Sequence, residues 1–593
     1  MPIVNAFGLI LAAVLSLSGS TSDVIAFVHA NVVPMDSDRV QRDQTVVVSG
    51  GRIAAVGPTG KTAVPQGAKV VDARGGYLTP GLADMHVHVS TPQELTLYVV
   101  NGVTTVFNLN GRPQYLEWRR RISDGKLLGP AIYSTGPTFD RPRTPEAAVE
   151  DVDKIAAAGY DGIKIYNQVG AAEYPALTAE AKKKGLVLIG HVAREPGFAA
   201  TLAAGQSIAH AEEYVYTFFR EDDPSSNTLV PPFDALKIPK AVALTKEAGI
   251  SVVPTLVAFR NIVRQATDVR TYLKDPNFAY MAPSMREKLE PARNTYATRF
   301  EPVVIPGLAL SYEFQRQLVK ALHAAGVPIL AGTDASWLGV PGFCLLDEIE
   351  IFQELGFTPY AAIKTATVDP ARLLRKESEF GTISVGKRAD LILSRENPLE
   401  DVRRLREPEG VMAAGRWVPK EERRRLLQAI PADYRRAMSE LARDAESDPR
   451  ALDAYLRAND PLGEIGSAVL GEVAAKRGPQ ALTSMLEGIR KSDPQSPLVR
   501  EEAINELGYA FLGRKQADAA IAVFRLNTEL YPQSGNTWDS LAETYLSTGQ
   551  KELGRQLYAK ALEVEPDYPN AKAAREIVEG RPTPGSENKE PGS

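Results

Sequence analysis

The chain has 593 residues, of which 44% are hydrophobic and 24% are charged, a composition typical of soluble globular proteins with more than one domain. Its 68 Lys and Arg residues are outnumbered by 73 Asp and Glu residues, which gives a net charge of −5 and excludes a basic protein that attracts nucleic acid or anionic membranes. The single cysteine, Cys344, excludes an intramolecular disulfide, so stability must come from core size.

The N-terminal segment is unusually apolar. Residues 6–17 form a continuous apolar run, and the small residues SGSTS follow it. The run is too short to span a bilayer but suits the core of a secretory signal, although no Lys or Arg precedes it. We expect residues 1–22 to be a signal peptide and the protein to be periplasmic or secreted, with no stable membrane span after cleavage. The alternative, a buried first strand, is disfavoured by the Ala, Leu and Ser content.

Two β-rich segments flank a long central region. Residues 23–76 and 379–418 both consist of short β-branched runs punctuated by Gly. We predict that they form one composite β-sandwich built from both sides of the central region.

The central region, residues 77–378, alternates strand-like and helix-like segments. Eight strand candidates occur at 82–88, 103–109, 130–136, 162–166, 187–192, 207–213, 250–257 and 327–334. This spacing predicts an α/β fold of the (β/α)8 TIM-type barrel class. A doubly wound open sheet is the alternative, but no G-x-G-x-x-G follows the first strand. Residues 260–325 are too long for one connection, and we expect a helical insertion or lid at the barrel mouth.

The C-terminal region is helical and repetitive. A shift of 34 residues aligns Leu507 with Leu541, Phe511 with Tyr545, Phe524 with Tyr558 and Pro532 with Pro566. Residues 421–580 therefore resemble an all-α tetratricopeptide (TPR)-like domain, with 421–500 as degenerate repeats or caps. Such helices mediate self-association or contact with a protein partner, or they pack on the barrel. We expect residues 581–593 to be a disordered tail.

Four of the six histidines lie at the ends of the predicted strands: His86, His88, His191 and His210. Residues two apart in a strand point the same way, so His86 and His88 project together, as one side of a zinc-type site would. Lys164 and Asp334 also occupy strand ends, where barrel enzymes place their active residues. Four unrelated histidines, a snorkelling lysine and an aspartate that caps a helix are the alternative. His29 and His323 lie outside this pattern and are expected to be structural.

The motifs together resemble the metal-dependent amidohydrolase superfamily, in its imidazolonepropionase-related and prolidase-like branch. They are LTPGLADMHVH, GIKIY, GHV, SIAHAEEY, GVPILAGTDA and TATVDPARLL…GTISVGKRADLIL, and they cover roughly residues 24–418. The resemblance implies two divalent metal ions, most plausibly zinc, held by His86, His88, Lys164, His191, His210 and Asp334. Imidazolonepropionases use one metal and lack the lysine, so Lys164 favours the two-metal relatives, in which a carbamate on this lysine bridges the ions.

The resemblance also implies a mechanism. His86, His88 and Asp334 would hold one ion, and His191 and His210 the other, with a bridging hydroxide that attacks a carbonyl. Asp334 would be the catalytic residue that takes the proton of the water and returns it to the leaving nitrogen. Near the strand ends, Tyr166, Tyr214 and Arg260 are candidate substrate-binding residues that could contact a carboxylate.

Three functions are compatible with these features. The first is hydrolysis of a C–N bond in a small-molecule amide, peptide or cyclic amide. The second is hydrolysis of an ester, lactone or phosphotriester by the same site. The third is a non-catalytic TPR scaffold with a vestigial barrel, against which the complete set of six metal-capable residues argues.

Overall fold

The structure, a computed structural model, describes residues 24–139, 144–220, 231–291, 294–335, 338–447 and 470–579, apart from residues 471–472, 475–476, 495 and 514. The expected signal peptide at 1–22 and tail at 581–593 lie outside the described residues. No described helix combines the length and the apolar character that crossing a membrane requires.

One sheet joins the two flanking segments. Its N-terminal strands are β1 (Ile25–Val32), β2 (Gln41–Ser49), β3 (Arg52–Pro58), β4 (Lys69–Asp72) and β5 (Tyr77–Pro80), and its C-terminal strands are β13 (Leu391–Ser394), β14 (Gly410–Ala413) and β15 (Arg416–Pro419). The order is β15-β14-β13-β5-β1-β2-β3, with β4 on β1. Both flanks therefore contribute to one hydrogen-bonded sheet. Its arrangement as a sandwich stays a prediction. The junction is β5, which pairs antiparallel with β13 and lies within the range predicted for the barrel.

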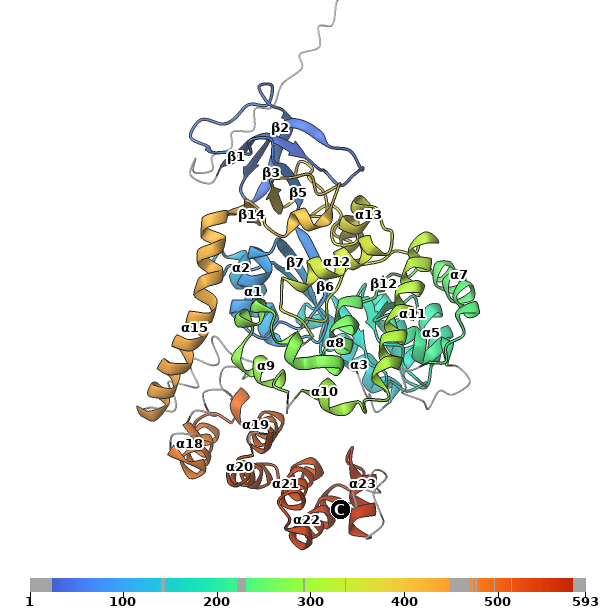
Figure 1. The fold of residues 1–593 in the computed structure, drawn as a ribbon, viewed down its shortest axis with the longest axis vertical. Coiled ribbons are helices and arrows are strands. Elements are labelled where there is room, and N and C mark those ends of the chain that lie inside the picture. Colours follow the sequence, from blue (N-terminus) through green and yellow to red (C-terminus); the bar gives the residue numbers. More distant parts are fainter. Residues whose placement is uncertain are drawn as a thin grey trace, which may run out of the picture.

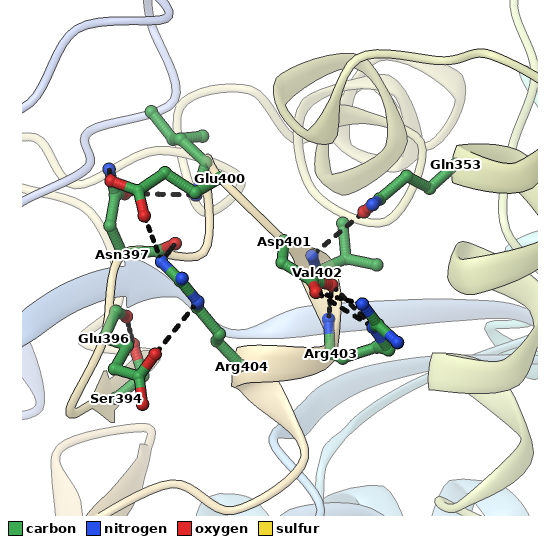
Figure 2. Close-up of polar contacts among 10 residues, drawn as sticks. Gln353, Ser394, Glu396, Asn397, Glu400, Asp401, Val402, Arg403 and Arg404 are labelled. Atoms are coloured by element: carbon green, nitrogen blue, oxygen red, sulfur yellow. Dashed lines mark hydrogen bonds and ion pairs between the residues drawn. The ribbon is translucent and has the colours of Figure 1, made fainter.

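The segment after β13 ties this sheet to the α/β body. Figure 2 shows that Arg404 in the 3-10 turn η5 (Val402–Leu405) contacts the carboxylates of Glu396 and Glu400. The backbone N–H of Val402 donates to Gln353 Oε1 on helix α12 (Cys344–Glu354) at 3.0 Å (Figure 2). Local ion pairs thus fold the loop, and one hydrogen bond links it to a helix of the central region.

The central region contains two parallel sheets. The first consists of β6 (Leu82–Val87), β7 (Val103–Asn108) and β8 (Ala131–Ser134), and the second of β9 (Gly162–Ile165), β10 (Val187–Gly190), β11 (Ser207–Ala209) and β12 (Val252–Val253). Isolated parallel bridges join Thr135 to Gly162, Ile329 to Val252 and Ala335 to Val87. The α/β class is confirmed. Nearly every residue of these strands is buried, as expected of parallel strands that are covered on both faces.

Helices connect these strands and surround them (Figure 1). They are α1 (Pro92–Val100), α2 (Pro113–Ser123), α3 (Pro145–Ala158), α4 (Tyr174–Lys183), α5 (Gly197–Ala203), α6 (Glu212–Tyr214), α7 (Ile238–Ala248), α12, α13 (Pro359–Lys364) and α14 (Val368–Leu373). Helices α1, α2 and α3 each begin with proline, which suits the first helical position because no partner is needed there for the missing N–H.

The long connection is helical, as the sequence predicts. It contains α8 (Leu256–Tyr272), η4 (Pro276–Tyr280), α9 (Pro283–Lys288), α10 (Thr295–Arg299) and α11 (Ile305–Ala324). The predicted boundary at residue 260 falls inside α8, because β12 ends early: Thr255 has a left-handed φ of 48° and the helix starts at Leu256.

The C-terminal region is helical. It contains α15 (Lys420–Ser447), α18 (Pro479–Ser492), α19 (Glu501–Gly513), α20 (Ala517–Leu530), α21 (Gly535–Ser547), α22 (Lys551–Val564) and α23 (Ala571–Val578). The pair α19–α20 recurs as α21–α22 with matching helix starts, at Glu501 and Gly535 and at Ala517 and Lys551. The assignment of these helices to the TPR class stays a prediction. In Figure 1 they follow α15 and lie beyond α9 and α10.

Candidate metal centre

All six metal-capable residues line one cavity of about 470 Å³: His86, His88, Lys164, His191, His210 and Asp334. Five of them come from the ends of β6, β9, β10 and β11. Asp334 comes from the segment 329–335, which forms β-bridges to β12 through Ile329 and to β6 through Ala335. The carboxyl ends of parallel strands meet at one edge, and the structure brings the side chains together there.

Asp334 lies against the His-x-His pair. Its Oδ1 is 3.0 Å from His88 Nε2 and 3.4 Å from His86 Nε2. Burial alone would raise the pKa of Asp334, but the hydrogen bond from His88 and the surrounding histidines and Lys164 outweigh it and hold the pKa at about 2. The aspartate is therefore ionised at neutral pH and can act as an anionic ligand or as a proton acceptor.

Lys164 is a buried residue of the cavity wall. The residue belongs to β9 and is 3% exposed. Its Nζ atom lies 3.5 Å from His86 Nε2. Burial lowers its pKa to about 8, although Asp334 and Glu213 act in the opposite direction. A substantial fraction of this amine is consequently neutral near physiological pH, unlike that of a surface lysine.

His191 is oriented by a buried carboxylate. Its Nδ1 is 2.8 Å from Glu213 Oε1, and the same carboxylate accepts the backbone N–H of Val192 at 3.0 Å and contacts Arg194. Burial would raise the pKa of Glu213, but His191 and Arg194 bring it to about 2. An ionised acceptor at Nδ1 fixes the imidazole with Nε2 unprotonated, the atom that a metal needs.

His210 is held through the same ring nitrogen as His191, but by a hydroxyl group. Its Nδ1 is 2.8 Å from Thr255 Oγ1, and its ring centroid lies 4.7 Å from those of both His86 and His191. His210, Thr255 and Asp334 have left-handed φ values of 73°, 48° and 51°. Such conformations cost free energy in non-glycine residues and gather where function requires them.

Asp84 stabilises the end of strand β6 by hydrogen bonds. Its carboxylate accepts the backbone N–H of His86 at 3.2 Å and both the N–H and the hydroxyl of Thr333 at 3.0 and 2.7 Å. It ties the His-x-His strand to the segment that carries Asp334. Burial raises its pKa to about 7.

Sequence reasoning missed Glu213, Thr255 and Asp84. The available signals were weak: Glu213 follows His210 by three residues, and Asp84 precedes His86 by two.

Of the three expected substrate contacts, only Tyr166 lines the cavity, with its ring edge on His191 at 4.5 Å between centroids. Tyr214 is fully buried, and its hydroxyl lies 3.0 Å from Thr245 Oγ1 on α7. Arg260 pairs with Asp347 on α12 at 2.7 Å. Tyr214 and Arg260 are absent from the cavity wall, because the helices that carry them turn their side chains toward neighbouring helices. The expectation that they contact substrate finds no support in this cavity and stays a prediction. His29 and His323 also lie elsewhere, His29 beside Asp43 and His323 stacked on Phe357.

The donor set suits a divalent cation. Donor atoms of His86, His210 and Asp334 lie within 4.8 Å of one another. Burial lowers the pKa of His86, His191 and His210, that of His210 to about 3, so these imidazoles are neutral and have lone pairs available. A cluster of neutral imidazoles with one ionised carboxylate is the ligand chemistry that zinc prefers.

Comparison with known proteins is consistent with this chemistry. The chain is 27% identical over 271 residues to adenine deaminase 2 of Bradyrhizobium sp. (strain ORS 278), and the aligned segment covers 40% of this chain and 44% of that protein. It is 25% identical over 472 residues to an adenine deaminase of Paracoccus denitrificans, covering 74% and 64%. The chain thus spans about half the length of the curated relatives it matches.

Solved structures share the fold. A Xaa-Pro dipeptidase with bound methionine in its active site superposes with a TM-score of 0.52 and 23% identity, over 67% of this chain and 100% of that one. Bottromycin amidohydrolase gives a TM-score of 0.54 and 24% identity, over 69% and 92%. The model of the Amidohydrolase family matches residues 77–418, more than half of the chain. The chain belongs to the amidohydrolase family.

Proposed function

We propose that this protein is a metal-dependent hydrolase that cleaves a C–N bond in a small-molecule amide, peptide or cyclic amide. The observation that carries the proposal is the convergence of four histidines, Lys164 and Asp334 on one cavity. The family membership supports it, and so do the similar proteins, which include deaminases and a dipeptidase. The proposal includes a closed (β/α)8 barrel, with the two parallel sheets joined through the bridges at Thr135, Ile329 and Ala335.

The six residues would hold two divalent ions, for which we propose zinc. His86, His88 and Asp334 would hold one, and His191 and His210 the other. Ions bound there would lower the pKa of a water molecule toward 7 and polarise a substrate carbonyl.

Lys164 would bridge the two ions as a carbamate. Its amine has a pKa of about 8, so the neutral form is accessible. Nitrogen would bond to the carbon of CO₂ and release one proton to solvent, which turns a buried cation into an anion. The change would also remove the penalty of a buried ammonium group beside neutral imidazoles.

Asp334 would move the proton. It is ionised, and its Oδ1 sits between His86 and His88 at the cavity surface. From there it would accept a proton from the attacking water and pass it to the leaving nitrogen. His191, locked by Glu213, and His210, locked by Thr255, would keep the site rigid during this transfer.

The test combines metal analysis with turnover. We expect the purified protein to contain one to two zinc ions per chain and to hydrolyse at least one member of a panel of dipeptides, N-acyl amino acids and cyclic amides. His191→Ala should abolish turnover with the fold intact. His29→Ala is the matched control, since His29 is exposed and remote from the cavity.

Three outcomes would contradict the proposal. Unaltered turnover in His191→Ala would remove the site from the chemistry. Turnover of lactones or phosphotriesters but of no amide in the panel would favour the second function. A protein that binds less than about one ion per chain and turns over nothing would favour the scaffold.

A further inference from the structure

The cavity is not built from the barrel alone. Glu506, on helix α19 of the C-terminal region, lines the same cavity as the six metal-capable residues, together with Met285, Lys288 and Tyr296 of the helical insertion. Barrel loops contribute Asn110 and Arg112. Part of the wall thus comes from a segment more than 170 residues after Asp334 in the chain.

Hydrophobic packing fixes α19 in this position. Ile504, Leu507 and Phe511 form the apolar face of α19 and are buried in one cluster with Met281 and Met285 of the insertion. Met285 belongs to this cluster and also lines the cavity, so the packed core reaches the cavity wall. Glu506 lies between Ile504 and Leu507, and its exposed carboxylate therefore has a defined position beside the cavity.

Helix α15 anchors the C-terminal region to the barrel by polar contacts. The hydroxyl of Tyr434 is 2.8 Å from Thr91 Oγ1, next to the cavity residue Ser90. Arg423 donates to the backbone oxygens of Val100 at 2.6 Å and Pro408 at 2.7 Å. All these residues are buried, Ser90 and Pro408 included, so the polar contacts of the junction are shielded from water.

The carboxylate of Glu506 is available to a ligand. Within the described part of the chain it makes no hydrogen bond and no ion pair, and its charge interacts with Arg500 only at a distance longer than that of an ion pair. Arg112 and Lys288 also line the cavity, and both are only partly exposed. The cavity therefore presents, on the α19 side, one anion without a hydrogen-bonded partner, and the barrel loop and the insertion contribute cations to the same cavity.

We propose that α19 completes the substrate cavity and that Glu506 is a specificity-determining residue, which favours substrates with an ammonium or guanidinium group remote from the bond that is cut. The inference rests on the proposed hydrolase function and assigns the C-terminal helices a role in substrate selection. A carboxylate with no internal hydrogen-bond donor gains a charge-assisted hydrogen bond from such a group, whereas a neutral substrate of equal length leaves it solvated.

The test compares two amides that differ only in a terminal ammonium group, with lysine in one and norleucine in the other. The readout is the lysine-to-norleucine ratio of kcat/KM in the full-length wild type and in variants. We expect Glu506→Gln to lower the ratio about two- to fivefold, as the loss of a partly exposed ion pair would, and Glu506→Lys to lower it further. Glu502→Gln is the matched control, because Glu502 is exposed one turn earlier on α19 and does not line the cavity.

The outcomes separate this inference from the function on which it rests. Turnover with a ratio that neither Glu506 variant changes more than Glu502→Gln does would overturn the inference and leave the hydrolase proposal standing. If neither amide is turned over, dissociation constants measured by calorimetry decide the matter: a ratio of affinities that falls in Glu506→Gln supports the inference, and an unchanged ratio overturns it.

Discussion

Replacement of Glu213 by glutamine should weaken metal binding without unfolding the protein. The Glu213 side chain is 1% exposed and serves three donors: His191 Nδ1, the Val192 N–H and Arg194. Glutamine keeps the shape but has one acceptor oxygen. If that oxygen serves Val192, the amide N–H₂ faces His191 and favours the tautomer with Nε2 protonated, which cannot bind a metal.

The expected loss follows from this change of tautomer. Substitution of a carboxylate that orients a metal-binding histidine typically costs 10- to 100-fold in metal affinity, about 1.4–2.8 kcal/mol. We expect a loss in this range for Glu213→Gln in a chelator competition titration with zinc, with turnover falling in parallel at limiting metal. Circular dichroism should show the helical content of the wild type.

The control is Glu195→Gln. Glu195 lies close by in sequence, but it is exposed, and among the described residues its carboxylate accepts only the backbone N–H of Ala171. Its substitution should leave zinc affinity unchanged. If Glu213→Gln and Glu195→Gln bind zinc with equal affinity, the argument that Glu213 fixes the tautomer of His191 is refuted.

Three further predictions concern Lys164, Glu348 and Gly190. ¹³C-labelled bicarbonate should give a carbamate signal that rises as pH increases through about 8, the pKa of Lys164, and equal labelling in Lys164→Gln would contradict this. Burial raises the pKa of Glu348 from 4.5 to about 8, so its contribution to stability is present below pH 4.5 and lost as pH rises through 8. Glu348→Gln should therefore gain in melting temperature over the wild type between pH 5 and pH 9, and a constant difference would count against the buried carboxyl. Gly190→Ala should destabilise by at least about 3 kcal/mol in denaturant unfolding, since φ is 147° and the added Cβ would lie 2.1 Å from the Ile165 oxygen. Gly159→Ala, with φ of 86° but open space, should cost about 1–2 kcal/mol, and equal costs would contradict the steric argument.

The strand ends were predictable because hydrophobic runs mark strands and polar residues mark where they stop. His86 and His88 end the run LADMHVH, and Lys164 is the one charge in GIKIY. The alternation of strands and helices then determines which ends meet. The run 250–257 shows where this reasoning fails, since Pro254 and the left-handed Thr255 convert its second half into the start of α8.

Side-chain direction could not be predicted from strand ends alone. Glu213 and Tyr214 are neighbours in the short helix α6, yet one faces His191 and the other packs toward α7. Helical geometry separates adjacent side chains by about 100°, and the phase of a three-residue helix has no sequence signal.

The contribution of Glu506 was unpredictable for a different reason. The repeat pattern of α19 to α22 reports on packing between neighbouring helices. It says nothing about which face rests on another domain. That choice depends on the hydrophobic cluster that Ile504 and Leu507 share with Met281 and Met285 of the insertion, which forms only in the folded protein.

The most direct test of the central claim is a crystal structure of the zinc-loaded protein with anomalous diffraction measured at the zinc edge. We expect zinc in the cavity, in contact with side chains from the set His86, His88, Lys164, His191, His210 and Asp334. Anomalous peaks confined to other parts of the molecule, with this cavity holding only water, would contradict the account.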